Sequence, residues 1–465
     1  MKDTPNVILC TCDQLRAFEV GCYGHPVVGT PNIDRLAAEG TRFEHAISNN
    51  PVCVPARSAL ITGQYSRTCA GRLDNAYADD GPVFERSRLR DTTIAELFRD
   101  AGYQTALIGK WHMGPHPLVT GFDEALFPLV PHRYTGQTYF RNRDEGFVVE
   151  EFGPAYELGE VRSFLSAERD RPFFLYYNIS LPHQPVMEGI PKRYTSMYTR
   201  DDVELRPNAY SDGQMSSSEF WFKVYLYSDY FWEWLADKRS GAGVFDGRGF
   251  PLPREDFDLR DLTALYYGAV TCVDDMLGGL MDALEDKGQA DDTIIAFISD
   301  HGDNLGSHNS YNKGQLIEES LRVPLVIRDP RCPAVESRAQ VAQTIDVYPT
   351  LASLAGLAVP PSVQGRDLSP VVRGEESVVE PNHVFSETSS GMIGVRTLDR
   401  LYAMQLGDEL NAIENRCALH FDLANDPYEE NNLRDAHDET LSALLEQWHR
   451  ETPRLLPPDE AARGG

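Results

Sequence analysis

The sequence predicts an α/β protein with a large, mostly parallel sheet sandwiched by helices, followed by a small α+β C-terminal domain with a short antiparallel sheet. Three observations lead to this fold class. Short apolar runs alternate with helical patterns over most of the chain, which is typical of β-α-β units. Two of these runs end in an aspartate, Asp13 and Asp300. From about Val379 onward the pattern changes to short, closely spaced strand-like segments.

Residues 1–378 are expected to form the large α/β domain. The run at residues 7–12 is continuously apolar, as expected for a strand that is buried on both faces. Residues 30–40 have a threonine cap, a proline in the first turn and a final glycine, which predicts a helix. The other expected strands are residues 104–109, 172–181, 293–299 and 323–328, and the other expected helices are residues 92–100, 262–284 and 341–357.

Residues 379–465 are expected to form the C-terminal domain. Its expected strands are residues 383–386, 394–397, 402–405 and 418–422, followed by an acidic helix near residues 439–450.

Residues 186–258 fit neither pattern and contain the aromatic run Phe220–Trp234. This run is too long for a typical strand and poorly periodic for a helix. Two interpretations stay open: packing against the main domain or a second copy in a homo-oligomer, or a wall of the substrate pocket.

Composition and net charge limit the location and the partners that are expected for this protein. No apolar run among the 465 residues approaches the roughly 20 needed to span a bilayer, and the start lacks a signal-peptide pattern, so a cytoplasmic location is expected. The eight cysteines show no zinc-type spacing and are expected to be reduced thiols. A net charge of −28 argues against nucleic acid or an anionic membrane as partner. A pocket for an anionic substrate must therefore be locally basic.

Residues 53–57, Cys-Val-Pro-Ala-Arg, open a segment that has the character of a short helix. A helix N-terminus favours an anion because its backbone N–H groups are unpaired and its dipole is positive there. Arg57 lies one turn further on and can offer a bidentate fork to sulfate or phosphate. The segment predicts a reactive thiolate at Cys53 beside an oxyanion site, with a buried, inert cysteine as the alternative.

The two aspartates at strand ends predict a cation site. Ligands of open α/β sheets bind at the carboxyl ends of the strands. If the strands before Asp13 and Asp300 lie near the middle of one parallel sheet, both carboxylates converge there. Two carboxylates from separate strands are suitable ligands for a hard cation.

The pattern Cys-x-Pro-x-Arg resembles the maturation signature of the formylglycine-dependent sulfatases of the alkaline phosphatase superfamily, in which the cysteine is oxidised to an aldehyde. The family's usual serine is Ala56 here. Further similar motifs occur in the family's order over some 430 residues: Asn6–Arg16, Gly109–His112, Ser299–Asp303, Asn312–Gly314 and Phe421–Leu433.

The resemblance implies a sulfatase that hydrolyses an aryl, alkyl or sugar sulfate monoester to an alcohol and inorganic sulfate. The nucleophile would be the geminal diol of a formylglycine made from Cys53 by a maturation enzyme. One divalent cation is implied, first Ca²⁺, with Mn²⁺ or Zn²⁺ as alternatives because an imidazole softens the site. The implied metal-site residues are Asp13, Gln14, Cys53, Asp300 and His301.

The implied catalytic residues are Cys53, Arg57, Lys110, His112, His183 and Lys313. Cationic side chains would balance the sulfate charge, and His183 or Lys313 would protonate the leaving alcohol. His112 would take the proton whose loss expels sulfate, since the ordinary pKa of histidine lies near neutrality.

Two alternatives stay open. Gln14 and His301 stand where many family members have Asp and Asn. Similar pairs occur in choline-sulfatase-like enzymes and in phosphonate monoester hydrolases, and the latter suggest such a hydrolase or a phosphodiesterase with some crossover activity. Lys110 and His112 favour the sulfatase, because that relative carries uncharged hydroxyl residues at the matching positions. A catalytically silent scaffold protein would need a lost nucleophile or metal ligand, and every central position here carries a competent residue.

Overall fold

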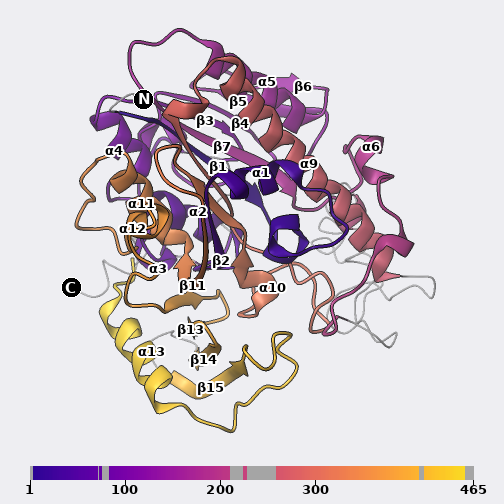
Figure 1. The fold of residues 1–465 in the computed structure, drawn as a ribbon, viewed down its shortest axis with the longest axis vertical. Coiled ribbons are helices and arrows are strands. Elements are labelled where there is room, and N and C mark those ends of the chain that lie inside the picture. Colours follow the sequence, from indigo (N-terminus) through magenta and orange to yellow (C-terminus); the bar gives the residue numbers. More distant parts are fainter. Residues whose placement is uncertain are drawn as a thin grey trace.

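A computed structural model describes residues 4–71, 73–75, 83–209, 224–227, 258–407 and 413–455. Within these residues a large mixed sheet forms the centre of the molecule, and a four-stranded antiparallel sheet belongs to a C-terminal domain beside it (Figure 1). The predicted fold class is confirmed. Most of the aromatic run Phe220–Trp234 lies outside the described residues.

The main sheet has the strand order β11-β2-β10-β8-β1-β7-β3-β4-β5-β6, with β9 also pairing with β2. Its strands are β1 (Asn6–Asp13), β2 (Thr41–Ile47), β3 (Gln104–Gly109), β4 (Glu124–Pro128), β5 (Gln137–Arg141), β6 (Phe147–Val149), β7 (Phe173–Pro182), β8 (Thr293–Ser299), β9 (Arg322–Val323), β10 (Leu325–Arg328) and β11 (Val335–Gln343).

The centre of this sheet is parallel. β1 lies between β7 and β8 and runs parallel to both, with Leu9 opposite Tyr176 on one side and Ala296 on the other. Every residue of β1 is buried, which explains its continuous apolar character. β10 is antiparallel to both of its neighbours, so the sheet as a whole is mixed.

Helices cover both faces of the sheet (Figure 1). α1 (Pro31–Glu39), α5 (Gly153–Ser166) and α9 (Leu259–Asp286) pack on one face, and α2 (Cys53–Thr62), α4 (Ile94–Asp100), α11 (Val347–Leu354) and α12 (Ser369–Val372) pack on the other. Short helices are α3 (Ser66–Cys69), α6 (Lys192–Thr195) and α10 (Glu318–Leu321).

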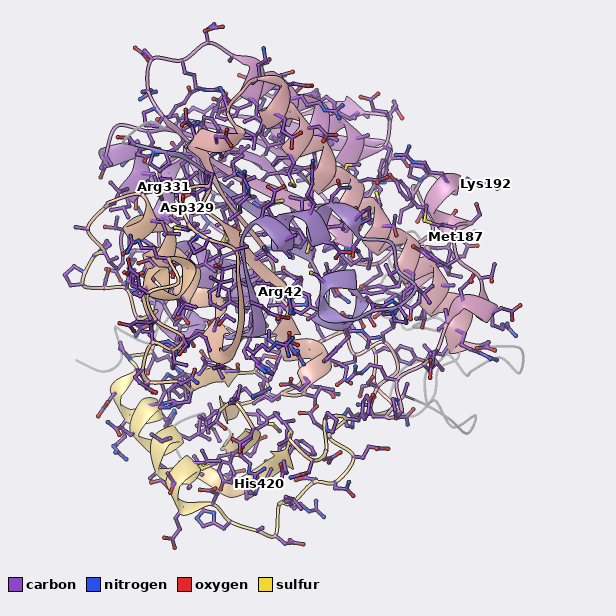
Figure 2. The ribbon with its side chains drawn as sticks, viewed as in Figure 1. Arg42, Met187, Lys192, Asp329, Arg331 and His420 are labelled. Atoms are coloured by element: carbon purple, nitrogen blue, oxygen red, sulfur yellow. The ribbon has the colours of Figure 1, made fainter. Side chains whose placement is uncertain are left out.

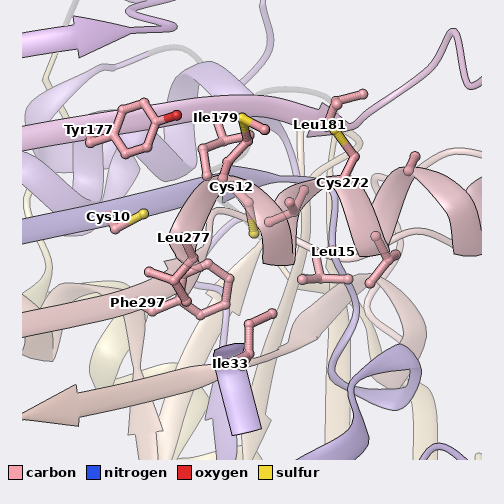
Figure 3. Packing of buried hydrophobic residues seen from close by; sticks show 14 of the residues in the cluster. Cys10, Cys12, Leu15, Ile33, Tyr177, Ile179, Leu181, Cys272, Leu277 and Phe297 are labelled. Carbon is pink, nitrogen blue, oxygen red and sulfur yellow. The ribbon is translucent and has the colours of Figure 1, made fainter. Parts of the chain in front are cut away.

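The side chains of β1 alternate between these two cores. Ile8 and Cys10 belong to the core under α9, whereas Val7 and Leu9 belong to the core under α2 and α4. Figure 3 shows Leu277 of α9 near Cys10 in the first of these cores. Each fully buried aliphatic side chain stabilises the fold by about 1.5–3 kcal/mol, so this double core fixes β1 in place.

Two predicted elements differ from the structure. The helix expected at residues 341–357 begins as the end of β11, continues through a 3₁₀ turn at Thr344–Asp346 and becomes α11 only at Val347. Val341 and Ala342 pair with β2, and this pairing overrides the local helical pattern. The strand expected at residues 323–328 is divided at Pro324, which has no N–H for a sheet hydrogen bond.

The C-terminal domain consists of β12 (Val384–Glu387), β13 (Met392–Arg396), β14 (Arg400–Leu406) and β15 (Ile413–Asp422), followed by α13 (Glu439–Glu451). His420 of β15, labelled in Figure 2, places its Nδ1 2.8 Å from the carbonyl oxygen of Ala436. The described part of the chain contains no helix that is both long and apolar enough to cross a membrane.

Candidate active site

Two carboxylates lie at the carboxyl ends of neighbouring central strands, at one edge of the sheet. β1 and β8 are parallel neighbours with Cys12 opposite Ser299, so Asp13 and Asp300 lie side by side. Both side chains are buried. The potential ligand atoms of four residues lie within 4.8 Å of one another: Asp13, Cys53, Asp300 and His301.

Cys53 is the first residue of α2, as the sequence predicts, and Val52 before it is extended. The Cys53 Sγ lies 3.2 Å from Nε2 of His301 and 3.7 Å from Oδ1 of Asp13. Burial alone would raise the pKa of the Cys53 thiol, but Lys110, Lys313 and His301 hold it well below its ordinary value. This environment favours a thiolate rather than an inert thiol.

Arg57 lies one turn along α2 and is completely buried. Its Nε donates to Oδ2 of Asp300 at 2.9 Å and its Nη1 donates to Oδ1 of Asn178 at 2.9 Å. Its Nη2 lies 3.9 Å from Oδ2 of Asp13 and makes no hydrogen bond within the described residues. The guanidinium therefore links Asp300 to Asn178 and lies near Asp13. Bidentate binding of an oxyanion by Arg57, which the sequence predicts, stays a prediction.

Two lysines complete the basic lining that the sequence requires. The ammonium of Lys110 contacts Oδ2 of Asp13, and the Nζ of Lys313 donates to Oε1 of Gln14 at 2.6 Å. Lys110 follows Gly109, whose φ of 95° and close approach to Asn178 exclude a side chain, since a Cβ would lie 2.1 Å from the carbonyl oxygen of Asn178.

Backbone carbonyls fix two of the histidine rings. Nδ1 of His301 lies 2.8 Å from the carbonyl oxygen of Gly302, and Nδ1 of His183 lies 2.7 Å from that of Gln184. A carbonyl only accepts, so each Nδ1 carries a proton. The Nε2 of His301 faces Cys53. Burial would lower the pKa of the His301 ring, but the charge of Asp300 raises it, so Nε2 offers a lone pair only after it loses its own proton. Burial and Lys313 lower the pKa of His183 to about 4, which makes this ring neutral at pH 7.

His112 and His132 complete the histidine cluster. His112 contacts Cys53, and burial together with Lys110 lowers the pKa of His112. The ring of His132 stacks on His183 with centroids 3.5 Å apart, and its Nδ1 is buried without a hydrogen bond to any described residue, 4.0 Å from Oδ2 of Asp13. His132 therefore lies beside the reacting groups.

The acidic group fits a divalent cation. Burial and the neighbouring charge of Asp13 raise the pKa of Asp300, which reflects repulsion between two adjacent carboxylates. A cation between them would remove this repulsion, and Nε2 of His301, once deprotonated, would be a third donor. The Gln14 Oε1 accepts from Lys313 and, like any amide oxygen, has a second lone pair.

The structure therefore brings all of the sequence-predicted site residues together at one edge of the sheet. Sequence reasoning missed His132, Asn178, Asp303 and Tyr225. Asn178 carried a signal, because it is a polar residue inside an apolar strand, and Asp303 belongs to a motif that was recognised. His132 and Tyr225 lie in segments without a recognisable pattern, and Tyr225 is one of four described residues within the aromatic run.

Comparison with known proteins agrees with this geometry. The model of the sulfatase family matches residues 5–357, and the model of the N-sulphoglucosamine sulphohydrolase C-terminal region matches residues 306–453. An arylsulfatase of Clostridium perfringens is 27% identical, over 93% of this chain and 91% of the relative.

Solved structures share the fold. The yidJ protein of Bacteroides fragilis superimposes with a TM-score of 0.79 and 26% identity over 97% of both chains. The phosphonate monoester hydrolase of Agrobacterium radiobacter has a TM-score of 0.67 and 24% identity, over 96% of this chain and 94% of that one, a likeness of fold alone. The predicted resemblance is confirmed: the chain belongs to the sulfatase family and is a sulfuric ester hydrolase.

Proposed function

We propose that this sulfatase hydrolyses small sulfate monoesters with a formylglycine made from Cys53 as its nucleophile and one divalent cation as its cofactor. The observation that carries the proposal is the position of the Cys53 Sγ. It lies at the start of α2, 3.2 Å from His301 Nε2, beside two carboxylates and among cationic side chains. A nucleophilic oxygen that replaces this sulfur on Cβ would be next to the cation and opposite an incoming anion.

The proposed cation ligands are Asp13, Gln14, Asp300 and His301, together with the group made from Cys53. Ca²⁺ is the first candidate because most of these donors are oxygens, and Mn²⁺ or Zn²⁺ are alternatives because His301 adds an imidazole. The bound cation would supply Lewis acidity, which lowers the pKa of a hydroxyl group. Formylglycine would supply that hydroxyl as a hydrated aldehyde, and its formation from Cys53 requires a maturation enzyme.

The remaining side chains are assigned catalytic roles according to their charge. Lys110, Lys313 and Arg57 would stabilise the negative charge that develops on the sulfuryl oxygens. His112 would be the base, because its lowered pKa keeps the ring neutral and able to accept a proton at pH 7. Since His183 is also neutral at pH 7, we assign protonation of the leaving alcohol to Lys313.

The alcohol half of the substrate is proposed as an aryl group or a sugar. The match of residues 306–453 to the C-terminal region of N-sulphoglucosamine sulphohydrolase supports a sulfated sugar, and the Clostridium arylsulfatase supports an aryl sulfate.

The second candidate is phosphonate monoester hydrolysis. It is favoured by Gln14 and His301, which replace an aspartate and an asparagine of many family members. Lys110 and His112 favour sulfate, since two ionisable groups suit a compact sulfuryl group whose oxygens must be held closely.

The test measures the rates at which wild type and Cys53→Ala hydrolyse an aryl sulfate and an aryl phosphonate monoester. We expect dominant sulfate cleavage that is lost in Cys53→Ala while the far-UV circular dichroism is unchanged. Full sulfatase activity in Cys53→Ala would refute the nucleophile. Dominant phosphonate cleavage that depends on Cys53 would make the second candidate the main activity.

A further inference from the structure

The side-chain amide of Gln14 is hydrogen-bonded at both ends. Its Nε2 donates to the carboxylate of Asp303 and, at 3.2 Å, to Oδ1 of Asn312. Its Oε1 accepts from the Nζ of Lys313 at 2.6 Å. Both N–H groups of the amide therefore have an acceptor, and the oxygen keeps one lone pair.

These partners allow only one orientation of the amide. A carboxylate such as Asp303 only accepts hydrogen bonds when ionised, so it must face the NH₂ group. The ammonium of Lys313 only donates, so it must face the oxygen. Rotation of the Gln14 amide by 180° would place like groups against each other at both ends, because oxygen would meet carboxylate and NH₂ would meet ammonium.

Asp303 is itself held by Tyr225. The Tyr225 hydroxyl donates to the Asp303 carboxylate, 2.7 Å from Oδ1, and accepts from the backbone N–H of Asn312 at 3.1 Å. The backbone N–H of Leu305 donates to the same Oδ1 at 2.7 Å. Tyr225, Asp303 and Gln14 are all completely buried, so water does not compete for these bonds.

The backbone of Gln14 is fixed as well. Gln14 has a φ of 68°, in the left-handed region, and its N–H donates to Oδ1 of Asp300 at 3.1 Å. Its carbonyl oxygen accepts from the hydroxyl of Tyr266 at 2.6 Å. A residue held at both backbone and side chain has little freedom to re-aim its oxygen.

We propose that Asp303, braced by Tyr225, is a positioning residue that aims Oε1 of Gln14 at the catalytic cation. The same contact explains why an amide and not a carboxylate occupies position 14. A carboxylate there would meet the carboxylate of Asp303 and the amide oxygen of Asn312, with no N–H to give to either. Positions 14 and 303 thus form a matched pair of donor and acceptor. The inference rests on the cation site of the proposed function.

The experiment is a double-mutant cycle on cation affinity, measured by calorimetric titration of the chelator-stripped full chain with Ca²⁺ and with Mn²⁺. Asp303→Asn is expected to weaken binding about 10- to 100-fold, the usual effect of losing a group that orients a metal ligand. Gln14→Glu, which keeps the length of the side chain, is expected to bind no tighter than wild type despite its added negative charge. Gln14→Glu with Asp303→Asn is expected to recover at least tenfold relative to Gln14→Glu, because the amide introduced at position 303 can donate to the carboxylate at position 14.

Tyr225→Phe has a matched control in Tyr139→Phe. Tyr139 also donates to a buried carboxyl group, that of Glu157, at 2.9 Å, but in the core under α5. We expect Tyr225→Phe to weaken cation binding and Tyr139→Phe to leave it unchanged, even if both lower the unfolding temperature. This contrast separates positioning from a general loss of stability.

The outcomes separate the two proposals. Tighter binding by Gln14→Glu, or additive effects in the cycle while wild type binds the cation, would overturn the positioning role and leave the proposed function intact. Absence of cation binding by wild type would overturn both the proposed cofactor and the positioning role.

Discussion

The two candidate proton donors differ in charge. Burial and Lys313 lower the pKa of His183 to about 4, so that its ring takes up a second proton and becomes charged only near or below that pH. Lys313 brings an ammonium group whose described contact is the neutral oxygen of Gln14. Protonation matters most for a poor leaving group, since an alkoxide is far less stable than a nitrophenolate.

We therefore predict that Lys313→Ala slows hydrolysis of an alkyl or sugar sulfate by about 10²- to 10⁴-fold, the usual contribution of a general acid. Hydrolysis of 4-nitrophenyl sulfate should fall much less. The measurement is kcat/KM for both substrates, with His183→Ala as the comparison. If His183→Ala and not Lys313→Ala shows this dependence on the leaving group, the assignment to Lys313 is wrong.

At the scale of single residues, the sequence pointed to side chains that the structure brings together where local pattern and position agree. Asp13 and Asp300 each end a recognisable strand, and Cys53 and Arg57 share one short motif at a helix start. Tyr225 could not be found, because its contact with Asp303 joins residues 78 positions apart and nothing around it is periodic. His132 was missed for a similar reason, since stacking on His183 is a property of the folded loop alone.

Among the elements, α5 and β5 meet through a buried carboxyl group. Glu157 of α5 accepts from the hydroxyl of Tyr139 of β5 at 2.9 Å, and its other oxygen has no hydrogen bond among the described residues. Burial raises the pKa of Glu157 to about 8. The folded protein thus keeps a proton at Glu157 that the unfolded chain releases above its ordinary pKa of 4.5.

Because the folded state binds the extra proton, stability from this group is lost as the pH rises from about 5 to 8. Glu157→Gln has no proton to release. We predict that this variant matches wild type at pH 5 and is more stable at pH 8, by on the order of a few kcal/mol. Urea unfolding at the two pH values tests this, with the exposed Glu168→Gln as control. An unchanged pH dependence in Glu157→Gln would contradict the prediction.

The element predictions failed where long-range pairing decided the structure. Val341 and Ala342 belong to an apolar stretch that fits a helix, but β2 lies alongside and takes them as a strand. β2 itself was not predicted, because its seven residues include Arg42, Glu44 and His45. The strands at the centre were predicted well, since burial on both faces requires an apolar run.

At the scale of the whole molecule, the C-terminal domain is joined to the main domain by a buried ion pair. The Nε of Arg67, on α3 next to α2, donates to Oε2 of Glu387 on β12 at 2.7 Å, and both side chains are buried. The guanidinium of Arg67 also lies over the ring of Trp448 of α13, 4.2 Å from its centroid. One arginine therefore contacts two elements of the C-terminal domain.

Glu387→Ala leaves the buried charge of Arg67 without its carboxylate partner. We predict a loss of about 3–5 kcal/mol in the free energy of unfolding, the usual result of breaking a buried pair on one side. Urea unfolding measures this loss. Asp100→Ala, which removes an exposed partner of Arg99, should change stability by less than about 1 kcal/mol. Equal effects of the two variants would show that the buried pair does not hold the domains together.

The order of the strands along the chain also determines how long Cys53 stays uncovered while the protein is being synthesised. Cys53 is completely buried once the sheet has formed, so the proposed maturation enzyme would have to reach it earlier. The residue that closes over its sulfur, His301, lies 248 positions further along the chain. At roughly 5–20 residues per second, a ribosome takes about 12–50 seconds to cover that distance. During this interval the central strand has no β8 to pair with, and Cys53 remains open to modification.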